Sequence, residues 1–269
     1  MKFSILIAHY NNFQYFEECY DSLMKQTYQD FEIIIVDDAS PENSFEKIKN
    51  LTAENPKVKV FKNDINKGVG FTKRKCAELA TGDICGFIDP DDVLKEMALE
   101  TAIKNFDDDK ISAVYSQLIL CDGDLNPDKV FPKSAQVKCG DPLFFNIHFE
   151  MNHFFAFRKS AYDKTIGINP ELTSAVDQDL YLKIYDTGNV KFVPEPNYLY
   201  RIHGKGVSQE KSKKDKLNAN WEIVIRDTIK RRELKKLYGQ PVTSIENTIA
   251  FIFKKQNSFF QKIKNKLIK

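Results

Sequence analysis

Short apolar runs alternate with amphipathic segments along the first part of the chain. The runs are rich in Val, Ile, Leu and Phe, and they cover residues 3–8, 31–38, 58–63, 83–89 and 112–120. The segments between the first four runs carry apolar residues at helical spacing, in residues 12–27, 43–54 and 69–80. Strands that alternate with helices in this way predict an α/β fold with a mostly parallel central sheet that is buried on both faces.

The pattern becomes less regular in the second part of the chain. Here we predict one strand at residues 154–158 and one helix at about residues 175–186. Residues 210–236 and 243–268 have the spacing of two basic helices, and the turn "YGQP" separates them. We therefore expect an α/β domain followed by a helical tail.

Composition is typical of a soluble globular protein in a reducing compartment. The chain has 269 residues, of which 42% are hydrophobic and 29% are charged. The five cysteines are scattered and form no C-x-x-C pair, which argues against a disulfide framework or a zinc site. The N-terminal apolar run is too short for a signal peptide, and no window approaches the roughly 20 apolar residues of a spanning helix. We expect a cytoplasmic protein.

Charge is distributed unevenly along the chain. Residues 209–269 hold 16 Lys and Arg against 6 Asp and Glu, a net charge of +10, whereas residues 1–208 hold 24 against 32, a net charge of −8. The basic segment also spaces Trp221, Ile225 and Ile229 four residues apart. Such a segment suits an anionic membrane surface, with the protein bound peripherally at the inner face of the membrane. The alternative is a helix that packs on the domain. Nucleic acid is not expected as a partner, because the acidic body would oppose it.

Carboxylates follow two of the predicted strands. One strand ends in Asp37 and Asp38, and another leads into Asp89, Asp91 and Asp92. Ligands of open parallel sheets bind beyond the carboxyl ends of the strands, and clustered aspartates there suit a hard divalent cation. Turn and helix-capping chemistry is an equal alternative for these acids.

Other motifs can be weighed in the same region. The sequence "DPDDV" also permits a phosphatase with Asp89 as nucleophile. A calcium-binding EF-hand loop is excluded, because Val93 and Leu94 occupy positions that need an oxygen ligand and a glycine. The glycines at 66–70 do not form the dinucleotide-binding pattern G-x-G-x-x-G, and no phosphate-binding P-loop is present.

Five segments match a known family in the same order along the chain. They are "SILIAHYNNFQYFEECYDSLMKQTYQDFEIIIVDDAS", "NKGVGFTKRKCAELATGD", "FIDPDD", "VDQDLYLKI" and "YRIHGKGVS". On these segments the chain resembles the inverting glycosyltransferases of family 2, which have the GT-A nucleotide-diphospho-sugar transferase fold. The resemblance implies a GT-A domain in residues 1–208, with a nucleotide-binding half at about 1–120 and an acceptor half at about 121–208. Residues 209–269 would be a basic helical tail.

The resemblance implies a set of nucleotide-binding residues. Ala8, His9 and Tyr10, at the end of the first strand, would line the pocket for the base. Asp38 would hydrogen-bond the base, and Arg74 would lie near the nucleotide or its phosphates. Arg74 also admits a plainer interpretation, as part of a solvated basic helix face.

The resemblance also implies the metal site and the base. Asp89, Asp91 and Asp92 correspond to the D-x-D motif, with the metal ion held chiefly by Asp91 and Asp92 and with ribose or metal contacts from Asp89. His203 would complete the metal and diphosphate site, and Asp177 would be the catalytic base. The alternatives are that Asp177 caps a helix and that His203 lies in a loop.

The implied function is a metal-dependent inverting transfer. A sugar would move from a nucleotide-diphosphate donor, a UDP-sugar, to a hydroxyl group of a glycan or lipid-linked acceptor, with Mn²⁺ or Mg²⁺ as cofactor. The chain departs from the family in having Val176 where a Glu is common, Lys75 where an Asn is common, and "IAHY" in place of Pro-Thr-Tyr. A non-catalytic nucleotide-sugar or partner-binding domain is the alternative function. We expect His148 and His153 to be packing or surface residues.

Overall fold

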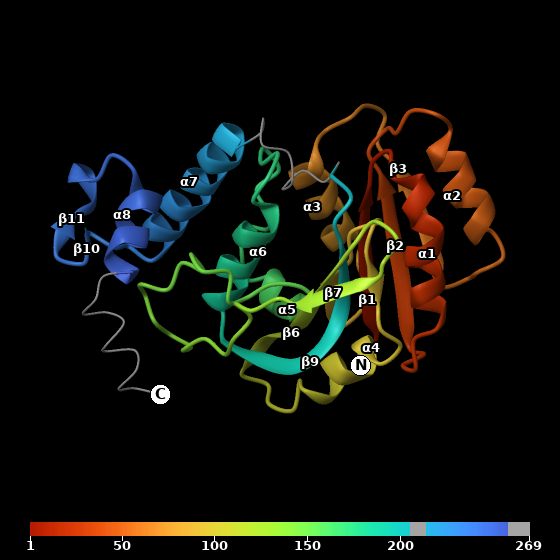
Figure 1. Ribbon diagram of the computed structural model, residues 1–269, viewed down its shortest axis with the longest axis horizontal. Coiled ribbons are helices and arrows are strands. Elements are labelled where there is room, and N and C mark those ends of the chain that lie inside the picture. The colour runs from red at the N-terminus through yellow and green to blue at the C-terminus, as the bar shows by residue number, and fades with distance from the viewer. Residues whose placement is uncertain (205–213, 258–269) are drawn as a thin grey trace.

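One curved sheet organises the protein (Figure 1). The structure is a computed structural model that describes residues 1–204 and 214–257. Within these residues the sheet has nine strands in the order β3-β2-β1-β4-β8-β6-β9-β5, with β7 paired to β6. Helices cover the sheet, and the α/β class predicted from the sequence is confirmed.

The first half of the sheet is parallel and follows the apolar runs. Its strands are β1 (Phe3–His9), β2 (Phe31–Asp37), β3 (Val58–Lys62) and β4 (Ile84–Phe87). The helices that connect them are α1 (Phe13–Met24), α2 (Ser44–Thr52) and α3 (Val69–Leu79). Strand β2 is buried along its whole length, as its unbroken apolar run predicts for a strand covered on both faces.

The second half of the sheet is mixed. Its strands are β5 (Val93–Leu94), β6 (Ile111–Cys121), β7 (Pro127–Val130), β8 (Phe155–Arg158) and β9 (Asn189–Arg201). Strand β8 runs antiparallel between β4 and β6, so the parallel pattern ends at β4. Strand β9 pairs parallel to β6 and carries β5 on its other edge. The sequence pattern did not predict β9, which contains Pro194 and Pro196.

Three further helices belong to the domain, α4 (Ala98–Lys104), α5 (Lys159–Tyr162) and α6 (Val176–Tyr185). The core divides into two clusters, one on each face of the sheet. Side chains alternate between the clusters along a strand, so that Leu6 joins one cluster while Ile5 and Ile7 join the other. The strands are thereby fixed on both faces, and their carboxyl ends form a stable rim.

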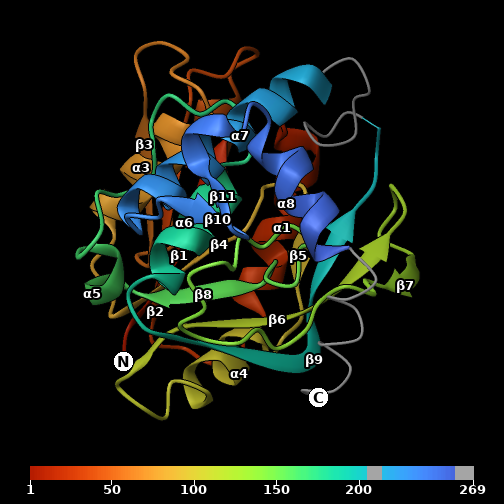
Figure 2. The same cartoon turned by 90° about the vertical axis from the view of Figure 1, so that its left-hand side faces the viewer.

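The C-terminal region packs against α6. It consists of α7 (Lys214–Arg231), the short hairpin β10 (Lys236–Leu237) and β11 (Gln240–Pro241), a 3-10 turn (Val242–Ser244) and α8 (Thr248–Gln256). Figure 2 shows α7 and α8 in front of α6.

The apolar face of α7 is turned toward the domain. Ile225 and Ile229 are buried in the core cluster that includes α6, and Trp221 packs against the same cluster. Of the two alternatives for the basic tail, packing on the domain therefore holds for residues 214–257, while the predicted helix segments at 210–213 and 258–268 lie outside the described residues. Among the residues that the structure describes, no helix is long and apolar enough to cross a bilayer.

Candidate active site at the strand ends

Lys73, Asp89 and Asp177 meet beyond the carboxyl ends of the parallel strands. Lys73 lies on α3, Asp89 follows β4, and Asp177 lies in the first turn of α6. The Nζ of Lys73 is 2.9 Å from Oδ1 of Asp89 and 2.7 Å from Oδ1 of Asp177. The lysine side chain is 4% exposed, whereas the two carboxylates are 31% and 32% exposed. One buried cation therefore joins two carboxylates that still face solvent.

Lys73 and Asp177 hold each other in their charged forms. Burial alone would lower the pKa of Lys73, but the Asp177 and Asp89 carboxylates raise it well above its usual range. Burial alone would raise the pKa of Asp177, but the charges of Lys73 and His153 and a hydrogen bond from Lys73 lower it. Asp177 is therefore ionised at neutral pH and able to accept a proton.

Lys73 reaches the site, and its neighbour Arg74 does not. Arg74 Nε donates to Glu78 Oε1 at 2.8 Å, and its Nη1 donates to the Ile168 carbonyl at 3.1 Å. This placement does not fit the nucleotide-contacting role expected for Arg74. Sequence reasoning overlooked Lys73, although a signal was present: it precedes the buried Cys76 by three positions, and that spacing puts both on one helix face.

Asp91 and His203 form a second pair in the same region. Nε2 of His203, just beyond the end of β9, lies 2.8 Å from Oδ2 of Asp91, and Tyr15 packs against the imidazole with ring centroids 4.9 Å apart. The carboxylate suits Mg²⁺ or Mn²⁺, and imidazole is a common ligand of divalent first-row metals. The donors of this pair therefore fit a divalent ion.

The described residues supply no complete set of metal donors around this pair. Within residues 1–204 and 214–257, no group of three or more His, Cys, Asp or Glu side chains is arranged to hold a metal ion. Diphosphate oxygens are the kind of donor that would complete such a site, as in other enzymes that act on phosphate esters. The metal assignment to Asp91 and His203 stays a prediction.

Asp92 points into the protein. It is 1% exposed, its Oδ2 accepts a hydrogen bond from the Tyr198 hydroxyl at 2.6 Å, and its Oδ1 accepts one from the backbone N–H of Arg201 at 2.8 Å. Burial, followed by the Asp91 and Asp89 charges, raises the pKa of Asp92 well above its usual range. This geometry does not fit the metal role expected for Asp92. It fits a structural tie between the loop after β4 and the end of β9.

Ala8, His9 and Tyr10 have different surroundings at the end of β1. His9 is fully buried, and its Nδ1 lies 2.9 Å from Oδ2 of Asp37. Ala8 packs partly buried against the core, and Tyr10 is 49% exposed. A fully buried imidazole does not fit the pocket-lining role expected for His9; it supports the strand ends instead. The roles of Ala8 and Tyr10 stay predictions.

Asp38 shapes the loop that leads into α3. Its Oδ1 accepts hydrogen bonds from Asn63 Nδ2 at 2.8 Å and from the Lys67 N–H at 2.9 Å, and its Oδ2 accepts one from the Gly68 N–H at 2.8 Å. The residue is 3% exposed. The carboxylate therefore fixes the start of the helix that carries Lys73, and its hydrogen bond to a base stays a prediction.

His153 lies on the other side of Asp177. Its Nε2 is 4.0 Å from Oδ2 of Asp177, its side chain is 13% exposed, and its ring stacks on Tyr198 with centroids 4.9 Å apart. The stacking agrees with the packing role expected for His153, and the ring also lies beside the Asp177 carboxylate. His148, in contrast, packs near Phe253 on α8, with ring centroids 5.8 Å apart.

The loop before Asp177 is held from two directions. From α3, the Gly70 N–H donates to the Leu172 carbonyl at 3.0 Å, and a Cβ on Gly70 would lie only 2.5 Å from that oxygen. From α6, Asp179 Oδ2 accepts a hydrogen bond from the Asn169 N–H at 2.8 Å, and Lys183 Nζ donates to the Gly167 carbonyl at 2.9 Å. Contacts from α3 and α6 therefore fix the loop that precedes Asp177.

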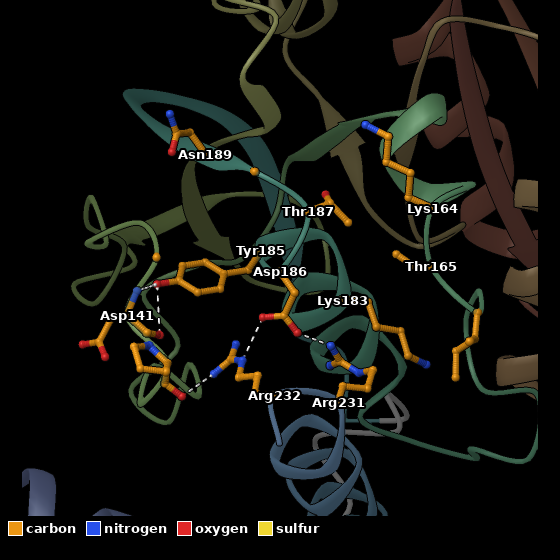
Figure 3. Close-up of a pocket in the computed structure, with 14 residues that line it drawn as sticks. Asp141, Lys164, Thr165, Lys183, Tyr185, Asp186, Thr187, Asn189, Arg231 and Arg232 are labelled. Atoms are coloured by element: carbon orange, nitrogen blue, oxygen red, sulfur yellow. Dashed lines mark hydrogen bonds and ion pairs between the residues drawn. The ribbon is translucent and has the colours of Figure 1, made fainter. Parts of the chain in front are cut away.

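A separate hollow of about 680 Å³ opens at the far end of α6 (Figure 3). Arg231 and Arg232 of α7 both pair with Asp186 there, and Arg232 also donates to the Pro142 carbonyl at 3.0 Å. Its lining includes none of the site residues predicted from the sequence. The ion pairs of Arg231 and Arg232 with Asp186 attach α7 to the end of α6.

Comparison with known proteins identifies similar sequences. The sequence model described as "Glycosyl transferase family 2" matches residues 4–166. The chain is 27% identical to a chondroitin synthase and to a hyaluronan synthase of Pasteurella multocida, over 97% of this chain in both cases. It is 28% identical to a chondroitin synthase of Escherichia coli over 94% of this chain. The chain spans only 26% to 36% of the length of these relatives.

Solved structures share the fold. S. aureus TarS 1–349 in complex with UDP-GlcNAc aligns with a TM-score of 0.71 at 20% identity, over 96% of this chain and 73% of that chain. The mannosyltransferase PcManGT from Pyrobaculum calidifontis, in complex with GDP-Man and Mn²⁺, aligns with a TM-score of 0.64 at 15% identity, over 99% and 79% of the two chains. These likenesses confirm the GT-A fold.

Proposed function

The chain belongs to glycosyltransferase family 2, and on that premise we propose that it moves a sugar from a nucleoside-diphosphate donor to an acceptor hydroxyl. The observation that carries this proposal is the Lys73–Asp177 pair at the carboxyl ends of the strands. A partly exposed carboxylate, ionised by a buried lysine, is what a hydroxyl nucleophile needs as a proton acceptor.

Asp177 is the general base of the proposed reaction. The acceptor oxygen attacks the anomeric carbon, the bond from that carbon to the diphosphate breaks, and the hydroxyl proton passes to Asp177. A carboxylate of ordinary pKa ~3.9 is a weak base, but the hydroxyl becomes acidic as its bond to carbon forms. A base that lies opposite the leaving group makes the reaction a single displacement, so the configuration at the anomeric carbon inverts.

Asp91 and His203 are proposed to receive the diphosphate through a divalent ion. Asp91 and His203 would hold Mn²⁺ or Mg²⁺, which when bound offsets the negative charge of the diphosphate leaving group. Lys73 contributes a fixed positive charge between Asp89 and Asp177, and Asp89 keeps enough exposure to contact a ribose or the metal. Asp92 joins the loop after β4 to the end of β9, and it is not part of the proposed metal site.

The donor is proposed to be a UDP-sugar. Support comes from TarS, whose structure is described in complex with UDP-GlcNAc. Ala8, Tyr10 and Asp38 are proposed to line the pocket for the base. The acceptor is proposed to be a glycan or a lipid-linked glycan, because the relatives are named as synthases of chondroitin and hyaluronan.

Peripheral membrane binding is proposed for the C-terminal end alone. The apolar face of α7 is buried on the domain, so it does not supply a membrane-binding face. Residues 258–269 remain, and their sequence combines Phe259 and Phe260 with four lysines. Co-sedimentation with phosphatidylserine vesicles tests this: we expect binding by the full chain and loss of binding in a chain that lacks residues 258–269. Equal sedimentation of both proteins contradicts the proposal.

A non-catalytic nucleotide-sugar-binding domain is the second candidate. It predicts donor binding without turnover, so measuring turnover separates it from the enzyme. The phosphatase alternative centred on Asp89 has lost its support, because the family match is to transferases.

A donor screen by thermal shift tests the proposed function. The protein is heated with Mn²⁺ and with UDP-GlcNAc, UDP-glucose or GDP-mannose in turn. Because a ligand that binds only the folded state raises the melting temperature, we expect one UDP-sugar to raise it most, and to do so only with the metal present. If none of the nucleotide sugars stabilises the protein with Mn²⁺, the proposal fails.

A further inference from the structure

Helix α7 contacts the loop before Asp177 through a buried amide. Nδ2 of Asn220 donates to the Thr173 hydroxyl at 2.9 Å and to the Ser174 hydroxyl at 2.7 Å. Asn220 is 8% exposed and Ser174 is 9% exposed, so water competes little for the bond between them. The two hydrogen bonds join the C-terminal helices to the segment that leads directly into α6.

The bonded segment sets where α6 begins. Ser174 is followed by Ala175, which has a left-handed backbone with φ of 57°, and then by the first residue of the helix, Val176. Asp177 follows within the first turn. A shift of the loop at Ser174 therefore moves the start of α6, and the Asp177 carboxylate moves with it.

The loop lies between α3 and α7, and the two helices hold it differently. On the α3 side the contact is between backbone atoms, from the Gly70 N–H to the Leu172 carbonyl. On the α7 side it is the Asn220 side chain that makes the contact. Because Lys73 also lies on α3, the backbone contact and the ion pair to Asp177 belong to one helix, whereas Asn220 provides an independent support.

The residue next to Asn220 reaches the second loop beside the base. Trp221 packs on Phe149 with ring centroids 5.3 Å apart, and this loop continues to His153. Neighbouring residues of α7 therefore contact the chain segments on both sides of the Asp177 carboxylate.

We propose that Asn220 is a positioning residue that holds the base Asp177 in its reactive place. This inference rests on the proposed function, in which Asp177 removes the acceptor proton. A displacement of about 1 Å in a reacting group can cost on the order of 100-fold in rate. The proposed donor contacts of Asp91 and His203 come from other elements, so loss of Asn220 should slow turnover and leave donor binding intact.

Four variants test the inference from both sides of the contact. Asn220→Ala removes the donor, T173V/S174A removes the two acceptors, and the triple variant removes all three. Asn218→Ala, on the exposed face of the same helix, is the matched control. The assay measures release of nucleoside diphosphate, with Mn²⁺, from the nucleotide sugar that stabilises the protein most. Melting temperature and donor KM are measured for each variant.

We expect N220A and T173V/S174A each to lower kcat about tenfold or more, with donor KM within about twofold of wild type. The triple variant should be no slower than the slower of its parents, because all act through the same bonds. A wild-type kcat for N220A overturns the inference. A triple variant whose loss of kcat is the product of the losses in its two parents also overturns it. So does a fall in kcat that is accompanied by a rise in donor KM and a lower melting temperature.

Asp177→Asn, assayed in parallel, separates this inference from the proposed function. If D177N turns over as fast as wild type, the proposed function is contradicted, and the inference about Asn220 with it. If D177N is inactive while N220A is unchanged, only the inference about Asn220 is contradicted.

Discussion

Lys73 and Asp177 are 104 positions apart in the sequence and 2.7 Å apart in the structure. The contact joins two helices. Helix α3 connects β3 to β4 in the parallel half of the sheet, and α6 precedes β9 in the mixed half. Because the lysine is buried and the carboxylate is partly exposed, the pair fixes one oxygen of Asp177 and leaves the other toward His153 and solvent. The proposed chemistry depends on this arrangement.

Removal of Lys73 should change the pH dependence of turnover. Lys73 lowers the pKa of Asp177, so the base stays ionised to lower pH than it otherwise would. In Lys73→Met that pKa rises, Asp177 is protonated at a higher pH, and the acid limb of kcat should move to higher pH. Turnover measured between pH 4 and pH 8 checks this, with Arg74→Gln expected to keep the wild-type limb. An acid limb that does not move in K73M contradicts the role of Lys73.

Asp91 and His203 should control the metal requirement. In Asp91→Ala or His203→Ala the proposed site loses one of its protein ligands, so the Mn²⁺ concentration for half-maximal turnover should rise at least ~10-fold. A Mn²⁺ titration at saturating donor measures this. If this Mn²⁺ concentration is unchanged in both variants, the proposed metal site is contradicted.

Asp92 should matter for stability instead. Asp92→Ala removes the acceptor for the buried Tyr198 hydroxyl and for the Arg201 N–H, and it leaves both donors without that partner. The free energy of unfolding should fall by about 3 kcal/mol, while the Mn²⁺ half-saturation of the folded variant stays at the wild-type value. Urea unfolding and the same Mn²⁺ titration give the two numbers. A large rise in the Mn²⁺ concentration for half-maximal turnover would contradict this prediction and indicate that Asp92 is a metal ligand.

Gly70 should not tolerate a side chain. An Ala there brings a Cβ to 2.5 Å from the Leu172 carbonyl oxygen, so α3 or the loop before Asp177 must move. We expect Gly70→Ala to lower the free energy of unfolding by about 1–3 kcal/mol and to slow turnover. Gly123→Ala is the control, because its Cβ would come no closer than 3.9 Å to the Ile202 carbonyl. Wild-type stability and turnover in G70A would show that this close contact is not needed.

The first half of the fold could be predicted because its signals are local. The apolar runs of β1, β2 and β4 form buried strands, and the runs of β1, β2 and β3 are each followed by a helical pattern. Strand β9 carries no such signal. Pro194 and Pro196 interrupt it, and its ladder with β6 accommodates them through shifts in register. That pairing depends on residues far away in the sequence.

The site was predictable in type but not in detail. The sequence identified Asp89, Asp91, Asp177 and His203 as candidates, and the structure brings them to one rim as two pairs, one of them bridged by Lys73. It could not show that Asp92 points inward, because that depends on a hydrogen bond from Tyr198, 106 residues away. Residue type alone does not separate Arg74 from Lys73 in the sequence, because the two side chains differ in which face of α3 they occupy.

The configuration of the first sugar product tests the central claim most directly. With water as the acceptor and Mn²⁺ present, wild type and D177N hydrolyse an α-linked UDP-sugar, and the anomer of the released sugar that forms first is read by NMR before it equilibrates. The account predicts a β product from wild type and turnover at least ~100-fold slower in D177N, because proton removal by a positioned base contributes that much or more. An α product, or full activity in D177N, would contradict it.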